Sequence, residues 1–405
     1  MNNMSAENNV PAIRFEGFSG EWEDNVLGSI ADVKTGPFGS TLHAEDYVED
    51  GEPIITTEHF KSGALPKNKV GIPQVSDDDY LRLKSYLLQL GDIVFSRVGS
   101  VDINAHVTMF QNGWLFSGRV LRVRTSDSID SEFLHYELST ERVKKSVVSR
   151  AVGQTMPSIN TEILKITPVN VPVDVKEQAK IGNYFQQLDT LIAQHQKKHD
   201  KLLNLKKALL EKMFTKQGAT EPAIRFAGFS GEWEEKAIKV MFKVTRGDVL
   251  AATETSNSKT TEKPYPVYSS QTKNDGLMGY YKDFLFENAI TWTTDGANAG
   301  TVNFRKGKFY STNVNGVLLS DKGYANKTIA EILNLTAWKH VSHVGNPKLM
   351  NNVMSEIKIT TPSDIEEQNT IAKLLDCLDA SVIQHQAQLK KLNNIKQACL
   401  EKMFV

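Results

Sequence analysis

The sequence predicts an α+β protein: two mixed α/β domains joined by two long antiparallel helices, in a duplicated frame with pseudo-twofold symmetry. Three observations predict this fold. A long helical segment occurs twice, a short aromatic motif occurs twice, and the stretches between motif and helix differ in sequence and length. An internal repeat on this scale indicates the architecture directly, because each copy is expected to fold alike. We expect the first domain at 1–171, the first helix at 172–216, the second domain at 217–361 and the second helix at 362–405.

The repeated helical segment runs over residues 172–214 and again over 362–404, with the landmarks P-x-D-x-x-E-Q, L-D, Q-H-Q and L-E-K-M-F in both copies. Apolar residues recur at steps of mostly three and four, which predicts a narrow seam along one helix face. A helix of roughly 35 residues is on the order of 50 Å long and cannot bury its own seam. We therefore expect the two copies to lie antiparallel. The predicted seam residues are Ile181, Phe185, Leu188, Ile192, His195, His199, Leu202, Leu205, Leu209 and Met213, with Ile371, Leu375, Leu378, Val382, His385, Leu389, Leu392, Ile395, Cys399 and Met403 in the second copy.

The aromatic motif of residues 11–23 returns almost unchanged at residues 222–234. The motif copies are 211 residues apart and the helix copies 190 residues apart, so the blocks between them differ in length. These blocks show no sequence similarity by eye. The chain therefore carries two different inserts in one duplicated frame.

Composition excludes several classes of protein. No stretch approaches 18 consecutive apolar residues, and the N-terminus lacks a signal-peptide pattern. The two cysteines, Cys377 and Cys399, would lie about 33 Å apart on one helix, far beyond the reach of a disulfide. We interpret them as buried or half-buried thiols in a reducing, cytoplasmic compartment. The net charge of −1 argues against a uniformly basic surface but allows local basic faces.

The first block reads as a mixed α+β domain. β-branched and aromatic residues predict strands at 54–57, 91–99, 105–110, 115–123 and 163–171. A short helix or strand is expected at 28–33, and an amphipathic helix with a basic end at 131–150. Glycine and proline mark loops at 34–40 and 153–157, and residues 75–79 read as an acidic surface loop.

The second block is richer in strand and loop. An extended segment is expected at 264–271, strands at 289–294, 317–320 and 357–361, and a helix at 327–338. Residues 302–305 and 308–310 read as a hairpin around Lys306 and Gly307, and residues 295–300 as a glycine loop. The loop at 345–347 is expected to correspond to residues 153–155 of the first domain.

Motifs for catalysis are missing from the sequence. It contains no P-loop, no dinucleotide-binding glycine motif, no nucleophile elbow, no H-E-x-x-H and no Asn-Pro-Pro-aromatic tetrapeptide. Two cysteines cannot form a cysteine zinc site. His195 and His385 occupy equivalent seam positions, where we interpret them as polar residues that fix the register of the helices.

The aromatic motif P-x-x-R-F-x-G-F-x-x-x-W, the Gly-x-Thr loop before a P-x-x-x-x-E-Q helix, and the L-x-x-x-K-x-x-L-L-x-x-M-F ending together resemble the specificity (S) subunit of type I restriction–modification systems. The resemblance covers essentially the whole chain. It implies two target-recognition domains that each read one half of a split, asymmetric DNA site. It also implies that the long helices space the domains and dock two methyltransferase subunits, joined by restriction–translocation subunits. No cofactor is expected in this subunit, whereas S-adenosylmethionine, ATP and Mg²⁺ are expected on the partners.

If the chain binds DNA, Lys and Arg should supply affinity through phosphates, and a few side chains should read base edges. Two domains about one helical turn (~34–36 Å) apart would meet the same face of a duplex. Candidate DNA contacts in the first domain are Thr35, Gly36, Phe38, Ser40, Arg97, Arg119, Arg122, Gln154 and Thr155, with Lys144, Lys145 and Arg150 as phosphate contacts. In the second domain they are Ser269, Ser270, Gln271, Asn298, Arg305, Lys306, Asn346 and Lys348. Arg119, Arg122 and Arg124 alternate with apolar positions, so they are either a basic, ligand-facing strand face or a solvated one.

Two alternatives stay open at this point. The chain could be a coiled-coil scaffold or an adaptor whose domains bind protein or glycan, or it could contain an enzyme domain with an unrecognised motif. A scaffold would show little salt-dependent DNA binding, and an enzyme would turn over without a partner subunit.

Overall fold

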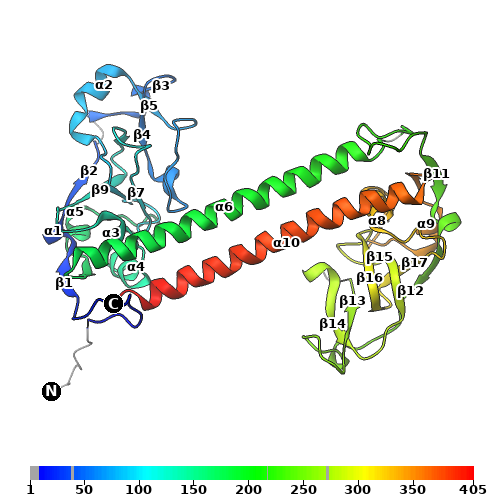
Figure 1. The fold of residues 1–405 in the computed structure, drawn as a ribbon. Helices are drawn as coiled ribbons and strands as arrows, with labels where there is room; N and C mark the ends of the chain where they lie inside the picture. The colour runs from blue at the N-terminus through cyan, green and yellow to red at the C-terminus, as the bar shows by residue number, and fades with distance from the viewer. Residues whose placement is uncertain (1–8, 38–40, 217, 271–272) are drawn as a thin grey trace. The chain divides into compact units, whose positions relative to one another are not determined.

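The computed structural model describes residues 9–37, 41–216, 218–270 and 273–405, and the chain divides into two compact units (Figure 1). The first unit comprises Met1–His195 with Gln388–Val405, and the second comprises Gln196–Ala387. Both repeated segments are long helices, α6 (Val175–Met213) and α10 (Ile365–Lys402). The first part of α6 and the last part of α10 belong to the first unit, and their remaining parts belong to the second. The domain boundaries at 171 and 361 stay predictions.

The first unit contains a four-stranded sheet in the order β2-β9-β6-β7, a second four-stranded sheet in the order β3-β5-β4-β8, and the ribbon β1-β10. Its strands are β1 (Glu23–Val26), β2 (Ala31–Thr35), β3 (Tyr47–Val48), β4 (Glu52–Ile55), β5 (Gln74–Val75), β6 (Ile93–Ser96), β7 (Asn104–His106), β8 (Leu115–Phe116), β9 (Val120–Thr125) and β10 (Pro168–Val171). Its short helices are α1 (Leu27–Ile30), α2 (Asp77–Arg82), α3 (Ser131–Glu137), α4 (Glu141–Val148) and α5 (Thr161–Lys165).

The second unit contains a six-stranded sheet in the order β12-β17-β15-β16-β13-β14 and the ribbon β11-β18. Its strands are β11 (Glu234–Ala237), β12 (Lys243–Arg246), β13 (Tyr265–Tyr268), β14 (Leu277–Tyr281), β15 (Phe286–Thr293), β16 (Val302–Ser311), β17 (Asn315–Leu319) and β18 (Lys358–Thr361). Its short helices are α7 (Ile238–Met241), α8 (Lys327–Ala337) and α9 (Asn351–Glu356).

The two blocks share a common core that their sequences do not reveal. The order β2-β9-β6-β7 of the first unit matches β12-β17-β15-β16 of the second, and antiparallel neighbours join the equivalent strands in both. A glycine follows the first strand of each sheet. The Gly36 N–H donates to the Val120 carbonyl and the Gly247 N–H to the Asn315 carbonyl, both at 3.2 Å. A Cβ on either glycine would overlap the backbone at Ser117 or Ser311, so the close approach is to the protein's own chain.

The long helices pair antiparallel within each unit. In the first unit, Lys396 Nζ donates to Asp189 Oδ1 at 2.5 Å. In the second, Lys206 Nζ donates to Asp379 Oδ1 at 2.6 Å. The two ion pairs occupy equivalent positions of the repeat, so the duplicated sequence builds the same helix contact twice. The antiparallel prediction is confirmed, although Leu205 is wrong as a seam residue because its side chain is 45% exposed.

The M-F dipeptide that ends each helix enters a domain core. Phe404 packs in the first unit with ring centroids 5.5 Å from Phe133, 5.6 Å from Phe185 and 6.1 Å from Trp22. Met213 and Phe214 are buried in the equivalent core of the second unit beside Trp233. Each domain core therefore includes the C-terminal end of the long helix that starts in the other unit.

The aromatic motifs contact the ends of both long helices. The Ile13 N–H donates to the carbonyl of Lys402 at 2.8 Å, and the Ile224 N–H donates to that of Lys212 at 2.9 Å. The guanidinium of Arg14 binds both carboxylate oxygens of Glu177 at 2.7 Å, and Arg225 binds Glu367 with the same distances. These contacts give a structural reason for the arginine of the aromatic motif and the glutamate of the helix.

Three element predictions are wrong where a cap residue decides the structure. Residues 75–79 belong to β5 and α2, because the Ser76 hydroxyl caps the helix by accepting from the Asp79 N–H. Residues 161–165 form α5 before strand β10, because Asn160 caps it. The helix predicted at 131–150 is two helices, since Thr140 caps α4.

The hairpin predicted at 302–310 is instead the single strand β16. Gly307, with φ of +74°, pairs across a bulge, where its N–H donates to Asn288 Oδ1 at 2.8 Å. The glycine is therefore the mark of a β-bulge and not of a turn. The prediction for the two thiols is half right, because Cys399 is half-buried but Cys377 is exposed.

Candidate nucleic-acid interface

The first unit has a hollow of about 630 Å³ where the segments that flank β6 and β9 meet the 152–158 loop. Arg97 follows β6, and Arg119 precedes β9. Ser158 closes the loop through isolated β-bridges to Val98 and Val152. Other lining residues are Pro37, Leu42, Tyr47, Thr56, Thr57, Glu58, Val98, Ser117 and Gly118. The hollow thus brings together segments that are far apart in the sequence.

Arg97 is held by backbone carbonyl oxygens. Its Nε donates to the Ile159 carbonyl at 3.2 Å, and its Nη1 donates to the Gly118 carbonyl at 2.9 Å. Burial lowers the pKa of Arg97, and burial also raises the pKa of Tyr47 against the opposing charge of Arg119. Arg119 itself is exposed and lines the same hollow. The hollow therefore offers two guanidinium groups, several hydroxyl groups and the carboxylate of Glu58, so it can both donate hydrogen bonds to phosphate or base acceptors and accept them from base amino groups.

The second unit has a smaller polar pocket of about 160 Å³ on the face of β15 and β16. Ser269, Asn298 and Arg305 line it, as predicted DNA contacts, together with Asp275, Gly276, Thr293, Thr301 and Asn303. The pocket presents amides, hydroxyls, a guanidinium and a carboxylate within one small space, so it can both donate and accept hydrogen bonds.

Arg305 is the cation among the described residues that line this pocket. It is 8% exposed, its guanidinium lies 3.8 Å from the Tyr268 ring centroid, and its Nε donates to Thr291 Oγ1 at 3.1 Å. Its Nη2 donates to the Asp275 carbonyl at 2.6 Å. Burial lowers the pKa of Arg305, while Tyr268 and Asp275 oppose the shift. Within the described residues no carboxylate forms an ion pair with Arg305, and Nη1 makes no hydrogen bond. The guanidinium of Arg305 is held in place but not neutralised by a carboxylate, so it is suited to donate hydrogen bonds to the acceptor atoms of a base edge.

A loop of the same shape stands beside each site. Val152 and Ser158 exchange backbone hydrogen bonds at 2.9 Å, and Ser342 and Lys348 do so at 2.8 and 3.0 Å. The equivalent residues are 190 positions apart, so Gly153 corresponds to His343. The predicted correspondence of Gly345 with Gly153 is therefore wrong by two residues. Lys348 Nζ lies 3.6 Å from Asp295 Oδ1, on the segment that leads to Asn298.

The structure places the remaining predicted residues apart from the pockets. Thr35 ends β2, with its hydroxyl buried and without a partner among the described residues, and Gly36 packs against its own chain. Ser270 is half-buried next to Ser269. Lys306 is exposed on the strand face opposite Arg305. Phe38, Ser40 and Gln271 lie outside the described residues.

The arginines of β9 do not form one basic face. Arg122 is 5% exposed and ion-paired to Asp32. Arg124 binds both carboxylate oxygens of Asp92 at 2.6 and 2.7 Å, and this hydrogen bonding raises the pKa of Arg124. Arg119 precedes the strand. Carboxylate pairing therefore gives Arg122 and Arg124 structural roles and leaves Arg119 as the cation that lines the hollow.

The predicted phosphate contacts lie on and after α4. Lys145 is exposed, Lys144 is half-buried, and Arg150 donates to the Ser146 carbonyl at 2.9 Å. Arg150 leads directly into the 152–158 loop. None of the three lines the hollow, and only Arg150 is next to the loop in the sequence.

Sequence reasoning missed several lining residues. Thr56, Thr57 and Tyr47 come from the sheet β3-β5-β4-β8 and the segments beside it, which the sequence did not predict as a sheet. Asn303 was also missed. It shares one face of β16 with the predicted contact Arg305, and their two-residue spacing within the strand predicted at 302–305 is the signal that could have found it.

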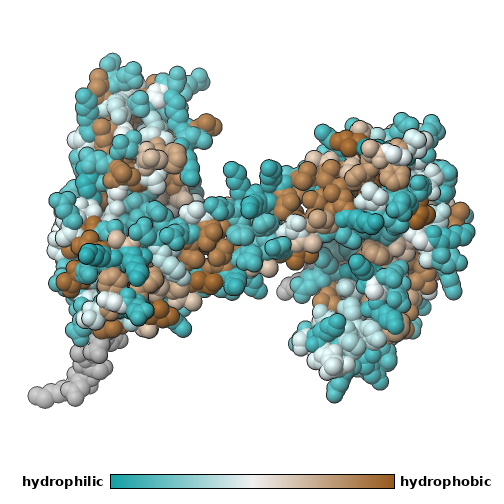
Figure 2. Space-filling model, in the orientation of Figure 1, coloured by the Kyte–Doolittle hydropathy of each residue, from teal (hydrophilic) through white to brown (hydrophobic). Residues whose placement is uncertain are grey.

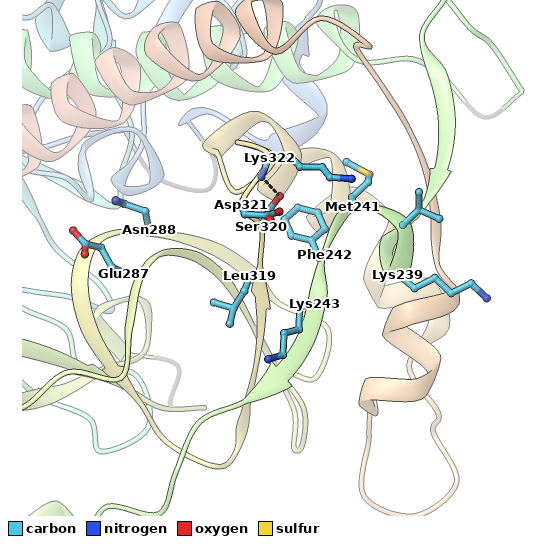
Figure 3. Close-up of a pocket in the computed structure, with 11 residues that line it drawn as sticks. Lys239, Met241, Phe242, Lys243, Glu287, Asn288, Leu319, Ser320, Asp321 and Lys322 are labelled. Atoms are coloured by element: carbon cyan, nitrogen blue, oxygen red, sulfur yellow. Dashed lines mark hydrogen bonds between the residues drawn. The ribbon is translucent and has the colours of Figure 1, made fainter.

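A further hollow of about 650 Å³ lies near α7 and β12 (Figure 3). Glu287, Asn288, Leu319 and Lys243 line it, and none of the predicted DNA contacts does. Figure 3 shows Lys239 pointing away from the others, and its ammonium binds Glu356 at 2.7 Å. The polar side chains that line this hollow do not converge on one point, so we do not assign a ligand to it.

Among the described residues, no group of three or more His, Cys, Asp or Glu side chains could hold a metal ion. No helix in the described part of the chain is long and apolar enough to cross a membrane. Figure 2 shows hydrophilic residues predominating on the visible face of the region that Figure 1 labels α2, β3 and β5.

A family model and two relatives indicate similarity to type I restriction–modification specificity subunits. The family described as type I restriction modification DNA specificity domain matches residues 19–204 and 230–395. A putative type I specificity subunit N-terminus of Mycoplasma pneumoniae is 40% identical over 144 residues, which cover 34% of this chain and 74% of the relative. The MpnII type I restriction enzyme specificity subunit of the same organism is 42% identical over 113 residues, which cover 27% of this chain and 34% of that subunit.

Among solved structures, the S subunit of a type I restriction–modification system from M. genitalium superposes with a TM-score of 0.71 at 15% identity. The match covers 98% of this chain and 99% of that one. It shows a shared fold.

Proposed function

This chain belongs to the type I restriction modification DNA specificity family, with two specificity domains, and we propose that each domain reads one half of a split, asymmetric DNA sequence. The subunit is non-catalytic in this proposal. It directs two methyltransferase subunits and restriction–translocase subunits to the site, and S-adenosylmethionine, ATP and Mg²⁺ bind those partners.

One observation carries the proposal: the two units share a sheet core but present different polar side chains at its rim. The first hollow is wide and has Arg97 and Arg119. The second is small and has Arg305 with Asn298 and Asn303. Base edges are distinguished by their patterns of hydrogen-bond donors and acceptors. Two domains that recognise different DNA sequences are therefore expected to share a fold and to differ in the polar side chains that face the bases.

A footprinting experiment tests this function. The full chain, assembled with its methyltransferase subunits, should protect two short segments separated by unprotected spacer positions. Log affinity should fall steeply and linearly with log salt, since phosphate contacts release counterions. A single continuous footprint would contradict two readers, and salt-independent binding would favour a protein scaffold.

Replacing Arg305 with methionine should weaken binding through the second half-site alone. Methionine keeps much of the side-chain volume but removes the ordered guanidinium, and a good bidentate base contact is worth about 1–3 kcal/mol of discrimination. We expect affinity for the specific site to fall about 5- to 150-fold, with relaxed preference in that half-site. Competition binding with single-base variants of the site measures both quantities.

Lys306→Met is the matched control for Arg305→Met. It removes the same formal charge from the opposite face of β16. This change should leave base preference intact and alter only the salt dependence. If both variants lost base preference equally, Arg305 would contribute through its positive charge and not through hydrogen bonds to the bases.

A further inference from the structure

The loops 152–158 and 342–348 belong to the duplicated frame and not to the variable blocks. Their residues are 190 positions apart, as are the long helices, whereas the aromatic motifs are 211 apart. In each loop the proline carbonyl accepts from a glycine N–H of the neighbouring segment, Gly99 to Pro157 at 2.8 Å and Gly296 to Pro347 at 3.0 Å. The constant part of each half therefore begins at residue 152 or 342.

The tips of these loops share a backbone but not their side chains. Residues 152–156 and 342–346 are all exposed, and Ile159 and Leu349 anchor the loops in the two cores. At equivalent tip positions Gln154 corresponds to Val344, and Thr155 to Gly345. A role common to both tips must therefore depend on the backbone.

The backbone of both tips offers unpaired donors. The N–H groups of residues 153–156 and 343–346 have no acceptor within the described residues. Neither tip contains Asp or Glu, and the segments leading into them carry cations, Lys145 and Arg150 in one and Lys339 in the other. Free backbone donors beside cations, without a carboxylate, suit phosphate oxygens.

We propose that the two tips bind the sugar–phosphate backbone through their main-chain N–H groups, one at each half-site and independently of sequence. The inference rests on the proposed function, DNA recognition by both domains. Two half-sites of different sequence have the same sugar–phosphate backbone, so two loops with the same backbone can share this role. Each loop would thereby fix its domain against the duplex while the adjacent pocket reads bases. Contact with base edges or with a partner subunit is the competing possibility.

Thr155→Pro and Thr155→Ala separate the backbone from the side chain. Proline removes the N–H donor, whereas alanine retains it. For the full chain with its methyltransferase subunits, we expect Thr155→Pro to lower the affinity about tenfold for every DNA sequence, with unchanged base preference. The salt slope of log affinity should stay the same, because a neutral N–H releases no counterion from the phosphate. Thr155→Ala should leave the affinity unchanged. Asn346→Pro and Asn346→Ala should behave likewise at the other half-site.

An amide-to-ester replacement at residue 155 removes the same donor with little change in shape, so it supplies the result if the proline variant misfolds. Altered base preference in either variant would overturn the inference in favour of base readout. Normal DNA binding with lost subunit assembly would overturn it in favour of a protein contact. An unchanged affinity of the proline and ester variants would overturn it too. If the unmodified complex shows no salt-dependent DNA binding, the proposed function itself fails.

Discussion

Replacing Phe404 with alanine is expected to destabilise the first unit by about 3–5 kcal/mol, the usual cost of a large aromatic-to-alanine change in a core. The ring lies among Phe133, Phe185 and Trp22, so its removal leaves a cavity bounded by rings that belong to three separate segments. Without the Phe404 ring, the C-terminal end of α10 should pack less tightly against the core of the first unit. Amide hydrogen exchange reports this directly, as reduced protection in residues 9–195 and 388–405.

Phe214→Ala is the matched variant in the second unit. It should reduce protection in residues 196–387 and leave the first unit protected. If either variant loosened both units equally, the division of α6 and α10 between two cores would be wrong. If neither lowered protection, the M-F ends would not contribute to the cores.

Replacing Arg14 with methionine is expected to cost about 3–5 kcal/mol, since it leaves the Glu177 carboxylate buried without its cation. Glu177 is 1% exposed and receives two hydrogen bonds of 2.7 Å from Arg14. Chemical denaturation monitored by signals from the first unit measures the change.

The double variant Arg14→Met/Glu177→Leu should recover most of that stability, because removing both charges also removes the cost of burying them. Arg225→Met should give a loss of similar size in the second unit, where Glu367 is equally buried. A double variant no more stable than Arg14→Met would contradict a buried-charge explanation and indicate lost packing of the aromatic motif instead.

The sequence was sufficient to predict the duplicated helices and their antiparallel pairing, because a repeated seam has few ways to be buried. It was not sufficient to reveal the common sheet core. The strands of that core use different side chains, and only backbone contacts such as those of Gly36 and Gly247 are the same. Hydrogen bonding of the backbone is not visible in residue types.

The candidate sites were predictable in part for a related reason. Arg97, Arg119 and Arg305 were recognisable as cations near loops, but nothing local distinguished them from Arg122 and Arg124. The difference arises from Asp32 and Asp92, which are distant in sequence. They form ion pairs with Arg122 and Arg124. Pocket residues such as Thr56 come from beside a sheet whose two-residue strands are too short for a periodic pattern.

The most direct test replaces residues 235–341, the variable block of the second half, with that of another family member and then sequences modified bases in DNA of the host. Independent readers on a constant frame predict that one half of the methylated sequence changes while the other half is retained. A change in both halves, or in neither, would contradict the division of recognition between the two units.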